Sequence, residues 1–163
     1  GVWEHRYLGN LWKTSEGQDR YRRGIYTYLK RTSPYPSMIT FDAGSREVCL
    51  VNRSSTNTPL QALVTMNDPV FLEAAMHLAK SHSNKETKAA ISEMYQKATL
   101  RSIDDAKLDA LVKLYEEAIK TFQDDSDQLQ NFFGLKEDID INTASLAVVA
   151  NAIMNLDEFL THG

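Results

Sequence analysis

The polar side chains best suited to chemistry are concentrated between positions 42 and 68. They are two arginines, three acids, three side-chain amides and a threonine: Asp42, Arg46, Glu47, Arg53, Asn57, Thr58, Gln61, Asn67 and Asp68. The forked donors of arginine suit a carboxylate, sulfate or phosphate, and beside amides and an acid they also suit sugar hydroxyls. Paired-acid hydrolysis by Asp42 and Glu47 has little support, because no spacing rule favours it. The stretch is therefore a candidate ligand-binding site.

The same residues also suit a structural role, which we prefer. Asp42 can bond within its own turn, and the charged pair at 46–47 can pair with neighbouring groups. Thr58 and either Asn67 or Asp68 are of the residue types that cap helices. Each polar group can thus be occupied in holding irregular backbone, and ligand binding stays open as the alternative.

Other catalytic and metal-binding patterns are missing from the sequence. It contains no GxGxxG or P-loop, no HExxH, no GxSxG and no CxxCH haem-attachment motif. The single cysteine, Cys49, cannot form a disulfide within the chain or a CxxC site. His77 and His82 are five positions apart and fall on different helix faces, unlike the i, i+4 pair that grips one ion. We therefore expect no metal or cofactor in this chain.

Length and charge narrow the class of protein further. A chain of 163 residues with 42% hydrophobic and 25% charged residues is expected to form one core. It has no apolar run near the roughly 20 residues that cross a bilayer. A net charge of −4 argues against a general binder of nucleic acid or anionic membranes. The absence of an initiator Met before Gly1 indicates a fragment of a longer protein.

The first third is predicted to hold one helix and an irregular, proline-rich segment. Ser15–Gln18 has the form of a capping box and predicts a helix over 18–31, with Tyr21 and Ile25 on its apolar stripe. The prolines within 33–36 end that helix. Two short β-prone runs near 38–51 flank a turn and form either a small hairpin or a loop.

From Thr58 onward, cap residues and apolar spacing predict a series of helices. Thr58 and Gln61 form a capping box at the start of one helix. Asn67-Asp68-Pro69 marks the start of the next helix in the same manner. Ser83–Glu86 is a second box, and Ser102 caps the longest helix. The acidic run 138–142 starts like a calcium loop but lacks its glycine and glutamate, so a helix N-terminus is preferred. The predicted helices cover 59–66, 69–81, a segment from the box at Ser83 to about 100, 103–123 and a last segment from 143.

The fold class is therefore mainly α, with five to seven helices around one core. Orthogonal or bundle-like packing is expected, in a single helical domain over 1–163. The first helix of the series contributes Leu60, Leu63, Val64 and Met66 to its apolar stripe. Aromatic residues concentrated in the first quarter are expected to serve core or interface packing.

A succession of motifs resembles one bacterial family. The motifs are Tyr21–Thr32, Pro36-Ser37-Met38, Phe41-Asp42, Arg46–Cys49, Arg53, Thr56–Leu63 and Asn67-Asp68-Pro69. They resemble the domain of unknown function 1553 (DUF1553, PSD1-like), common in planctomycetes and also found in Bacteroidetes. The resemblance covers about 2–80, and Asn155–Leu160 is similar to the family's ending, whereas most of 81–163 matches only in helical character. The chain would be the C-terminal portion of that domain.

The resemblance implies a large, exported parent protein in the periplasm or at the cell surface. Upstream modules of that parent often include a cytochrome-c-like haem domain and sometimes a lectin-like insert, so haem is implied for the parent only. The family is linked to polysaccharide-degrading gene sets. Its recurring polar residues coincide with the 42–68 stretch, except that Asn52 stands where the family usually has a basic residue.

We expect a non-catalytic helical interaction or scaffold module. Its partner would be the upstream domains of the parent or another protein. The alternative is a carbohydrate-linked enzyme or ligand-binding domain, with a possible glycan held around Asp42, Arg46 and Arg53.

Overall fold

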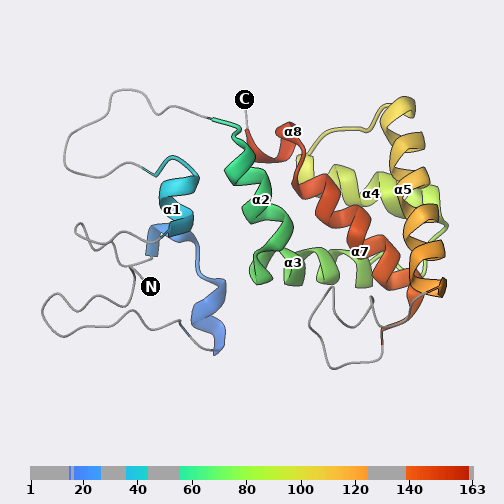
Figure 1. Cartoon of the computed structure of the whole chain (residues 1–163), viewed down its shortest axis with the longest axis horizontal. Helices are drawn as coiled ribbons and strands as arrows, with labels where there is room; N and C mark the ends of the chain where they lie inside the picture. The colour runs from blue at the N-terminus through green and yellow to red at the C-terminus, as the bar shows by residue number, and fades with distance from the viewer. Residues whose placement is uncertain (1–14, 16, 27–35, 44–55, 125–138, 162–163) are drawn as a thin grey trace, which may run out of the picture. The chain divides into compact units, whose positions relative to one another are not determined.

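The computed structural model describes residues 15, 17–26, 36–43, 56–124 and 139–161 (Figure 1). Contacts divide the chain into two compact units, Gly1–Ser54 and Ser55–Gly163. The described elements are 3-10 turns and seven α-helices, and no described residue lies in a strand, so the mainly α class is confirmed. None of these helices is long and apolar enough to cross a membrane.

The first described elements of the first unit are two 3-10 turns, η2 (Gly17–Tyr21) and η3 (Gly24–Tyr26). The prediction of one α-helix over 18–31 is therefore wrong where the structure describes it. Tyr21 and Ile25, predicted on a buried stripe, are 68% and 72% exposed. Gly24 interrupts the stretch, and each remaining piece is too short to repay the cost of helix nucleation.

The next described element is the short helix α1 (Pro36–Thr40). It replaces the first arm of the hairpin considered near 38–51, and the second arm lies outside the described residues. Pro36 stands at the first helical position, where its fixed φ favours the helix and its missing N–H costs nothing. Local proline geometry thus overrides the β propensity of Met38–Phe41.

The second unit contains six described helices, joined by short connections wherever the structure describes them. They are α2 (Pro59–Asn67), α3 (Pro69–Lys80), α4 (Thr87–Thr99), α5 (Asp105–Asp124), α7 (Ile141–Met154) and α8 (Asp157–Leu160). Their order and approximate bounds confirm the series of helices expected after Thr58.

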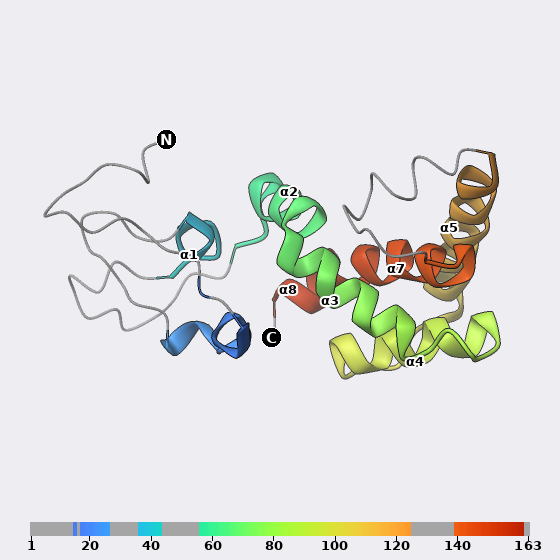
Figure 2. The same ribbon diagram turned by 90° about the horizontal axis from the view of Figure 1, so that it is seen from below.

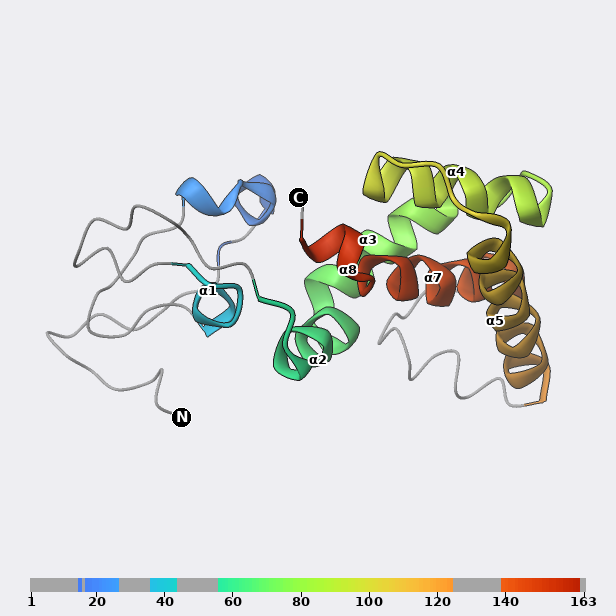
Figure 3. The same ribbon diagram turned by 90° about the horizontal axis from the view of Figure 1, so that it is seen from above.

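Helix α7 is the centre of this unit. It contacts α2, α3, α4, α5 and α8, and it runs from α5 at its start to α2 and α8 at its end (Figure 2, Figure 3). Three of its alanines, Ala144, Ala147 and Ala150, are fully buried. A helix that is mostly apolar and buried on most sides is enclosed by its neighbours, and its small side chains let those neighbours approach closely.

The predicted stripes of α4 and α5 pack against α7. Ile91, Met94 and Tyr95 of α4 are almost completely buried, as is Phe122 of α5. Leu111 and Tyr115 of α5 join the same hydrophobic cluster. Apolar spacing in these long helices was therefore sufficient to identify the core face.

Three helix starts differ from the sequence prediction. Helix α4 is capped by Glu86, because the Ser83 hydroxyl donates instead to Lys80 O at the end of α3 (3.2 Å). Helix α5 begins after Asp104, whose Oδ1 accepts the backbone N–H of Lys107 (2.8 Å), rather than at Ser102. Helix α7 begins two residues earlier than expected, capped by Asp140. In each helix a carboxylate takes the cap, which also complements the helix dipole.

Candidate functional site

The predicted polar stretch is divided between the two units. Arg46, Glu47 and Arg53 lie outside the described residues. Asp42 belongs to the first unit, and the remaining five residues belong to the second: Asn57, Thr58, Gln61, Asn67 and Asp68. The structure therefore places the last five on α2, at its ends or just before it, and the grouping of Asp42 with Arg46 and Arg53 stays a prediction.

Asp42 ends helix α1 with a left-handed backbone, at φ 57°. Its N–H donates to Ile39 O (3.2 Å), and the next N–H, of Ala43, donates to Met38 O (2.8 Å). These two bonds are the pair that defines a Schellman motif, in which the left-handed residue follows the C-cap. Aspartate tolerates this conformation better than most non-glycine residues. The backbone of Asp42 therefore has a structural task.

Thr58 and Gln61 form the predicted capping box at the start of α2. The N–H of Gln61 donates to Thr58 Oγ1 (3.3 Å), and the N–H of Thr58 donates to Gln61 Oε1 (2.7 Å). The Gln61 amide also donates to Thr56 Oγ1 (3.1 Å), and its side chain is buried. Both residues satisfy backbone donors that the first turn leaves without partners.

Asn67 and Asp68 stabilise the junction between α2 and α3. Asp68 Oδ1 accepts the N–H of Val70 (2.9 Å) and caps α3. The side-chain amide of Asn67 donates to Leu63 O in the last turn of α2 (2.8 Å). Together they satisfy a carbonyl of one helix and a donor of the next, as expected for a structural role.

A set of contacts that the sequence did not indicate joins α2 to α7 and α8. We call it the polar seam, defined by Asn57, Thr65, Asn151, Asn155 and Asp157. The Asn151 amide donates to Thr65 O (3.0 Å), and the Thr65 hydroxyl donates to Asn155 Oδ1 (2.9 Å). The Asn57 amide donates to Asp157 Oδ1 (3.0 Å). Residues about 90 to 100 positions apart are thereby fixed together.

The seam joins two of the segments that carry family-like motifs. One is the segment Thr56–Leu63, and the other is the closing segment Asn155–Leu160. Both segments were therefore visible in the sequence as motifs, but nothing in either motif indicated that the two would be in contact. Neither periodicity nor spacing predicts contact across so long a separation.

The seam reverses the expected orientation of α2. Polar Gln61 and Thr65 are 2% and 0% exposed, whereas Leu60, Leu63 and Met66 are 57%, 58% and 48% exposed. The prediction that these three residues belong to the core stripe is therefore wrong. Because the polar side of the helix is occupied by α7 and α8, its apolar side faces outward. We call Leu60, Leu63 and Met66 the outer face of α2.

A second polar cluster joins α4, α5 and α8. Tyr95 Oη donates to Glu158 Oε2 (3.1 Å), and Lys107 forms an ion pair with the same carboxylate. The hydrogen bond from Lys107 lowers the pKa of Glu158 and outweighs the effect of burial, which alone would raise it. The same bond raises the pKa of Lys107. Both shifts favour the charged forms of Glu158 and Lys107, so the pair stabilises the contact between α5 and α8.

Ser81, His82 and Glu93 superficially resemble a hydrolase triad. Ser81 Oγ lies 2.8 Å from His82 Nδ1, and His82 Nε2 lies 3.7 Å from Glu93 Oε2. However, His82 Nδ1 is also 2.8 Å from Leu78 O, and a carbonyl only accepts, so Nδ1 must carry a hydrogen. It cannot take a proton from Ser81, which itself donates to Leu78 O (2.8 Å). Glu93 is paired with Lys85. The group stabilises the end of α3.

The described residues contain no group of three or more His, Cys, Asp or Glu side chains that could hold a metal ion. The acidic run before α7, considered as a calcium loop, instead supplies the cap Asp140, which accepts from Thr143 N (2.7 Å) and Thr143 Oγ1 (2.6 Å). Burial raises the pKa of Asp140, but the bonds from Thr143 outweigh it and lower that pKa overall. The preference for a helix N-terminus is thus confirmed.

Comparison with known proteins identifies the family. No curated protein and no solved structure matches the chain. A family model described as PSD1, protein of unknown function (DUF1553), matches residues 4–115, which is more than half of the 163 residues. The match includes the 42–68 stretch and helices α2, α3 and α4. The chain therefore belongs to the PSD1 family of proteins of unknown function (DUF1553).

Proposed function

We propose that the second unit is a non-catalytic helical interaction module that binds protein through the outer face of α2. The observation that carries this proposal is the reversed orientation of that helix. A helix on the surface of a unit normally buries its apolar side and exposes its polar side. Helix α2 does the opposite, because the polar seam holds it that way.

The energetics favour an occupied outer face. Leu60, Leu63 and Met66 are each about half exposed, and covering each one would contribute about 1 kcal/mol. The polar seam holds the opposite side of α2, so the helix cannot bury both sides within the described part of the unit. A partner surface would resolve this conflict.

The composition of α2 indicates the kind of surface that would cover it. From Pro59 to Asn67 the helix carries no charged residue, in a chain where charged residues make up 25%. Depletion of charge is typical of the buried centre of protein interfaces. The partner surface should accordingly be apolar and uncharged, and binding should be little weakened by salt.

The proposed partner is another domain of the same longer, exported bacterial protein. Support comes from the family resemblance, which implies upstream modules and a link to polysaccharide degradation. A haem of such a protein would reside outside this chain, because a single cysteine cannot supply the paired thiols of a c-type attachment motif. Arg46 and Arg53 lie outside the described residues, and the ligand site around Asp42 stays the alternative prediction.

The test measures binding between this chain and the domains encoded before it in the same gene. Titration calorimetry should give saturable binding, and Leu63→Glu should weaken it by about tenfold or more, because a buried unpaired carboxylate is costly. Leu100→Glu is the matched control, since Leu100 is 84% exposed at a different surface.

Two outcomes would contradict the proposal. One is the absence of binding, or of any upstream domain, in the intact gene product. The other is equal binding by Leu63→Glu and the parent sequence. Circular dichroism of each variant must first match the parent chain, so that lost binding is not lost folding.

A further inference from the structure

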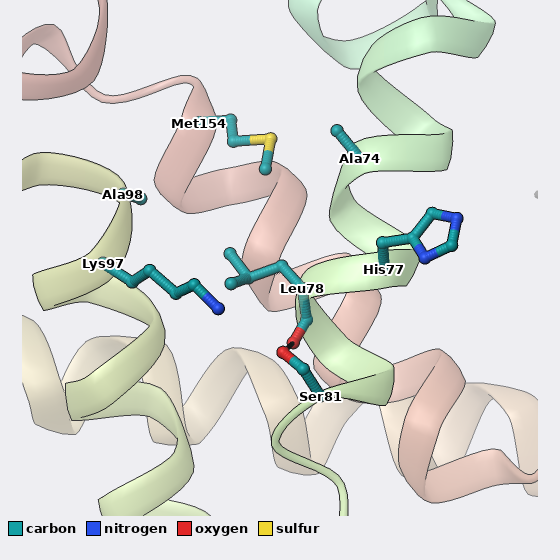
Figure 4. Close-up of a pocket in the computed structure, with 7 residues that line it drawn as sticks. All are labelled: Ala74, His77, Leu78, Ser81, Lys97, Ala98 and Met154. Atoms are coloured by element: carbon teal, nitrogen blue, oxygen red, sulfur yellow. Dashed lines mark hydrogen bonds between the residues drawn. The ribbon is translucent and has the colours of Figure 1, made fainter. Parts of the chain in front are cut away.

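A pocket of about 430 Å³ lies between α3, α4 and the end of α7. It is lined by residues of α3 and its C-cap, of α4 and of α7: Ala74, His77, Leu78, Ser81, Lys97, Ala98 and Met154 (Figure 4). All of these residues belong to the second unit. The volume falls within the range of about 300 to 1,000 Å³ that is usual for small-molecule sites.

Small residues on facing helices create the space. Positions 74 and 98 are alanines, so each helix leaves room that a larger side chain would fill. Leu78 and Met154 add apolar wall, and Met154 is 7% exposed. The thioether of methionine adapts easily to the shape of a ligand. Such walls suit an apolar body of modest size.

Lys97 supplies the polar recognition element. Its side chain extends from α4 toward Leu78 and Ser81 (Figure 4). Lys85, Lys88 and Lys107 pair with carboxylates. The ammonium group of Lys97, by contrast, has no hydrogen bond or ion pair with any residue that the structure describes. An ammonium group beside an apolar wall attracts an anion more strongly than one fully in water.

The other polar groups at the pocket offer little to an anion. The Ser81 hydroxyl donates to Leu78 O (2.8 Å), so its hydrogen is already used. The imidazole of His77 points away from Lys97 (Figure 4). The site thus offers one cation beside apolar walls. The ligand that fits it best has one negative charge and an apolar chain.

We propose that this pocket binds a small amphipathic carboxylate. Its apolar chain would lie against Ala74, Leu78 and Met154, and its carboxylate would pair with Lys97. A ligand of about ten non-hydrogen atoms at ordinary ligand efficiency should bind with a Kd on the order of millimolar. The site is separate from the outer face of α2 and does not depend on the proposed docking.

Octanoate is the probe, titrated into the full chain and followed by two-dimensional NMR. Saturable shifts should appear at α3, α4 and the end of α7. Lys97→Met should weaken octanoate binding by about twofold to fivefold, as expected for losing one exposed ion pair. Octan-1-ol, which has the same chain without the charge, should bind the parent chain and Lys97→Met equally.

Two further variants sharpen the result. Ala74→Leu should fill the pocket and weaken both probes, and because Ala74 is exposed the helix should tolerate the larger side chain. Lys113→Met on α5 removes an exposed lysine elsewhere and should change neither affinity. Non-saturable shifts, or octanoate binding unaffected by Lys97→Met or by Ala74→Leu, would overturn the proposal.

Discussion

At the scale of single residues, two described residues other than glycine have a left-handed backbone conformation. Asp42 (φ 57°) ends α1, and Leu100 (φ 60°, ψ 20°) ends α4. Aspartate occupies such positions at moderate cost, whereas leucine has no polar group to compensate for the crowding of its Cβ. Leu100 is also the most exposed large hydrophobic residue among those described, at 84%. Its side chain therefore contributes strain without packing.

Replacing Leu100 by glycine should stabilise the fold. Leu100→Gly removes the steric cost of the left-handed conformation, partly offset by the greater freedom of glycine in the unfolded chain, for a net gain of about 0.5 to 1 kcal/mol. Urea unfolding would measure this change. Leu100→Ala keeps a Cβ and should bring little gain, so equal stability of the two variants would contradict the explanation by strain.

At the scale of elements, carboxylates cap α3, α4 and α7, and each one satisfies backbone donors in the first turn. Asp140 makes the shortest of these cap bonds, to Thr143 N (2.7 Å), at the start of the helix on which the others pack. Loss of this cap should therefore affect the whole second unit.

Asp140→Ala should destabilise the fold by about 1 kcal/mol near neutral pH, because it leaves donors at the start of α7 without partners. The pKa of Asp140 is lower in the folded state than its ordinary value. Its contribution is thus fully present above the unfolded pKa of about 3.9 and is lost as pH falls through the lower folded value.

Chemical denaturation of both proteins between pH 7 and pH 2 would check this expectation. The difference in unfolding free energy should be constant from pH 7 to about 5 and should shrink below about 4. Asp140→Asn retains a good cap type and serves as the control, with a smaller loss at pH 7. A difference independent of pH would show that charge on Asp140 does not contribute.

At the scale of the whole molecule, the hydrophobic core that the described residues form lies within the second unit. The buried hydrophobic residues that form one cluster run from Ala75 to Met154, and their partly buried neighbours extend to Phe159. By contrast, Tyr21, Ile25 and Ile39 of the first unit are more than half exposed. The apolar burial seen in the described residues therefore lies within 55–163, and it should be enough to drive the folding of that unit.

A fragment comprising residues 55–163 should consequently fold alone. We expect cooperative thermal unfolding and a helical circular dichroism spectrum, with an unfolding free energy close to that of the full chain. Amide exchange should be slowest in α7, where the helix is enclosed by its neighbours. A fragment that stays unfolded, or that unfolds without cooperativity, would contradict this assignment of the core.

The capping box at Thr58 and Gln61 and the apolar spacing of α4 and α5 were readable from the sequence, because caps and helical periodicity depend on neighbours a few positions away. The short 3-10 turns around Gly24 could not be predicted from the sequence. The cap and the apolar spacing indicate a helix there, but they do not show that each piece is too short to be stable.

The sequence by itself determined that helices follow one another after Thr58, and which family the motifs resemble. Only the tertiary structure decided which side of α2 is buried. Its apolar residues alone predicted an inward stripe, but Asn151, Asn155 and Asp157, from the other end of the chain, hold the polar side instead. Hydrogen bonds between distant residues leave no periodic trace, and a buried polar group that loses its partner costs more than an exposed leucine.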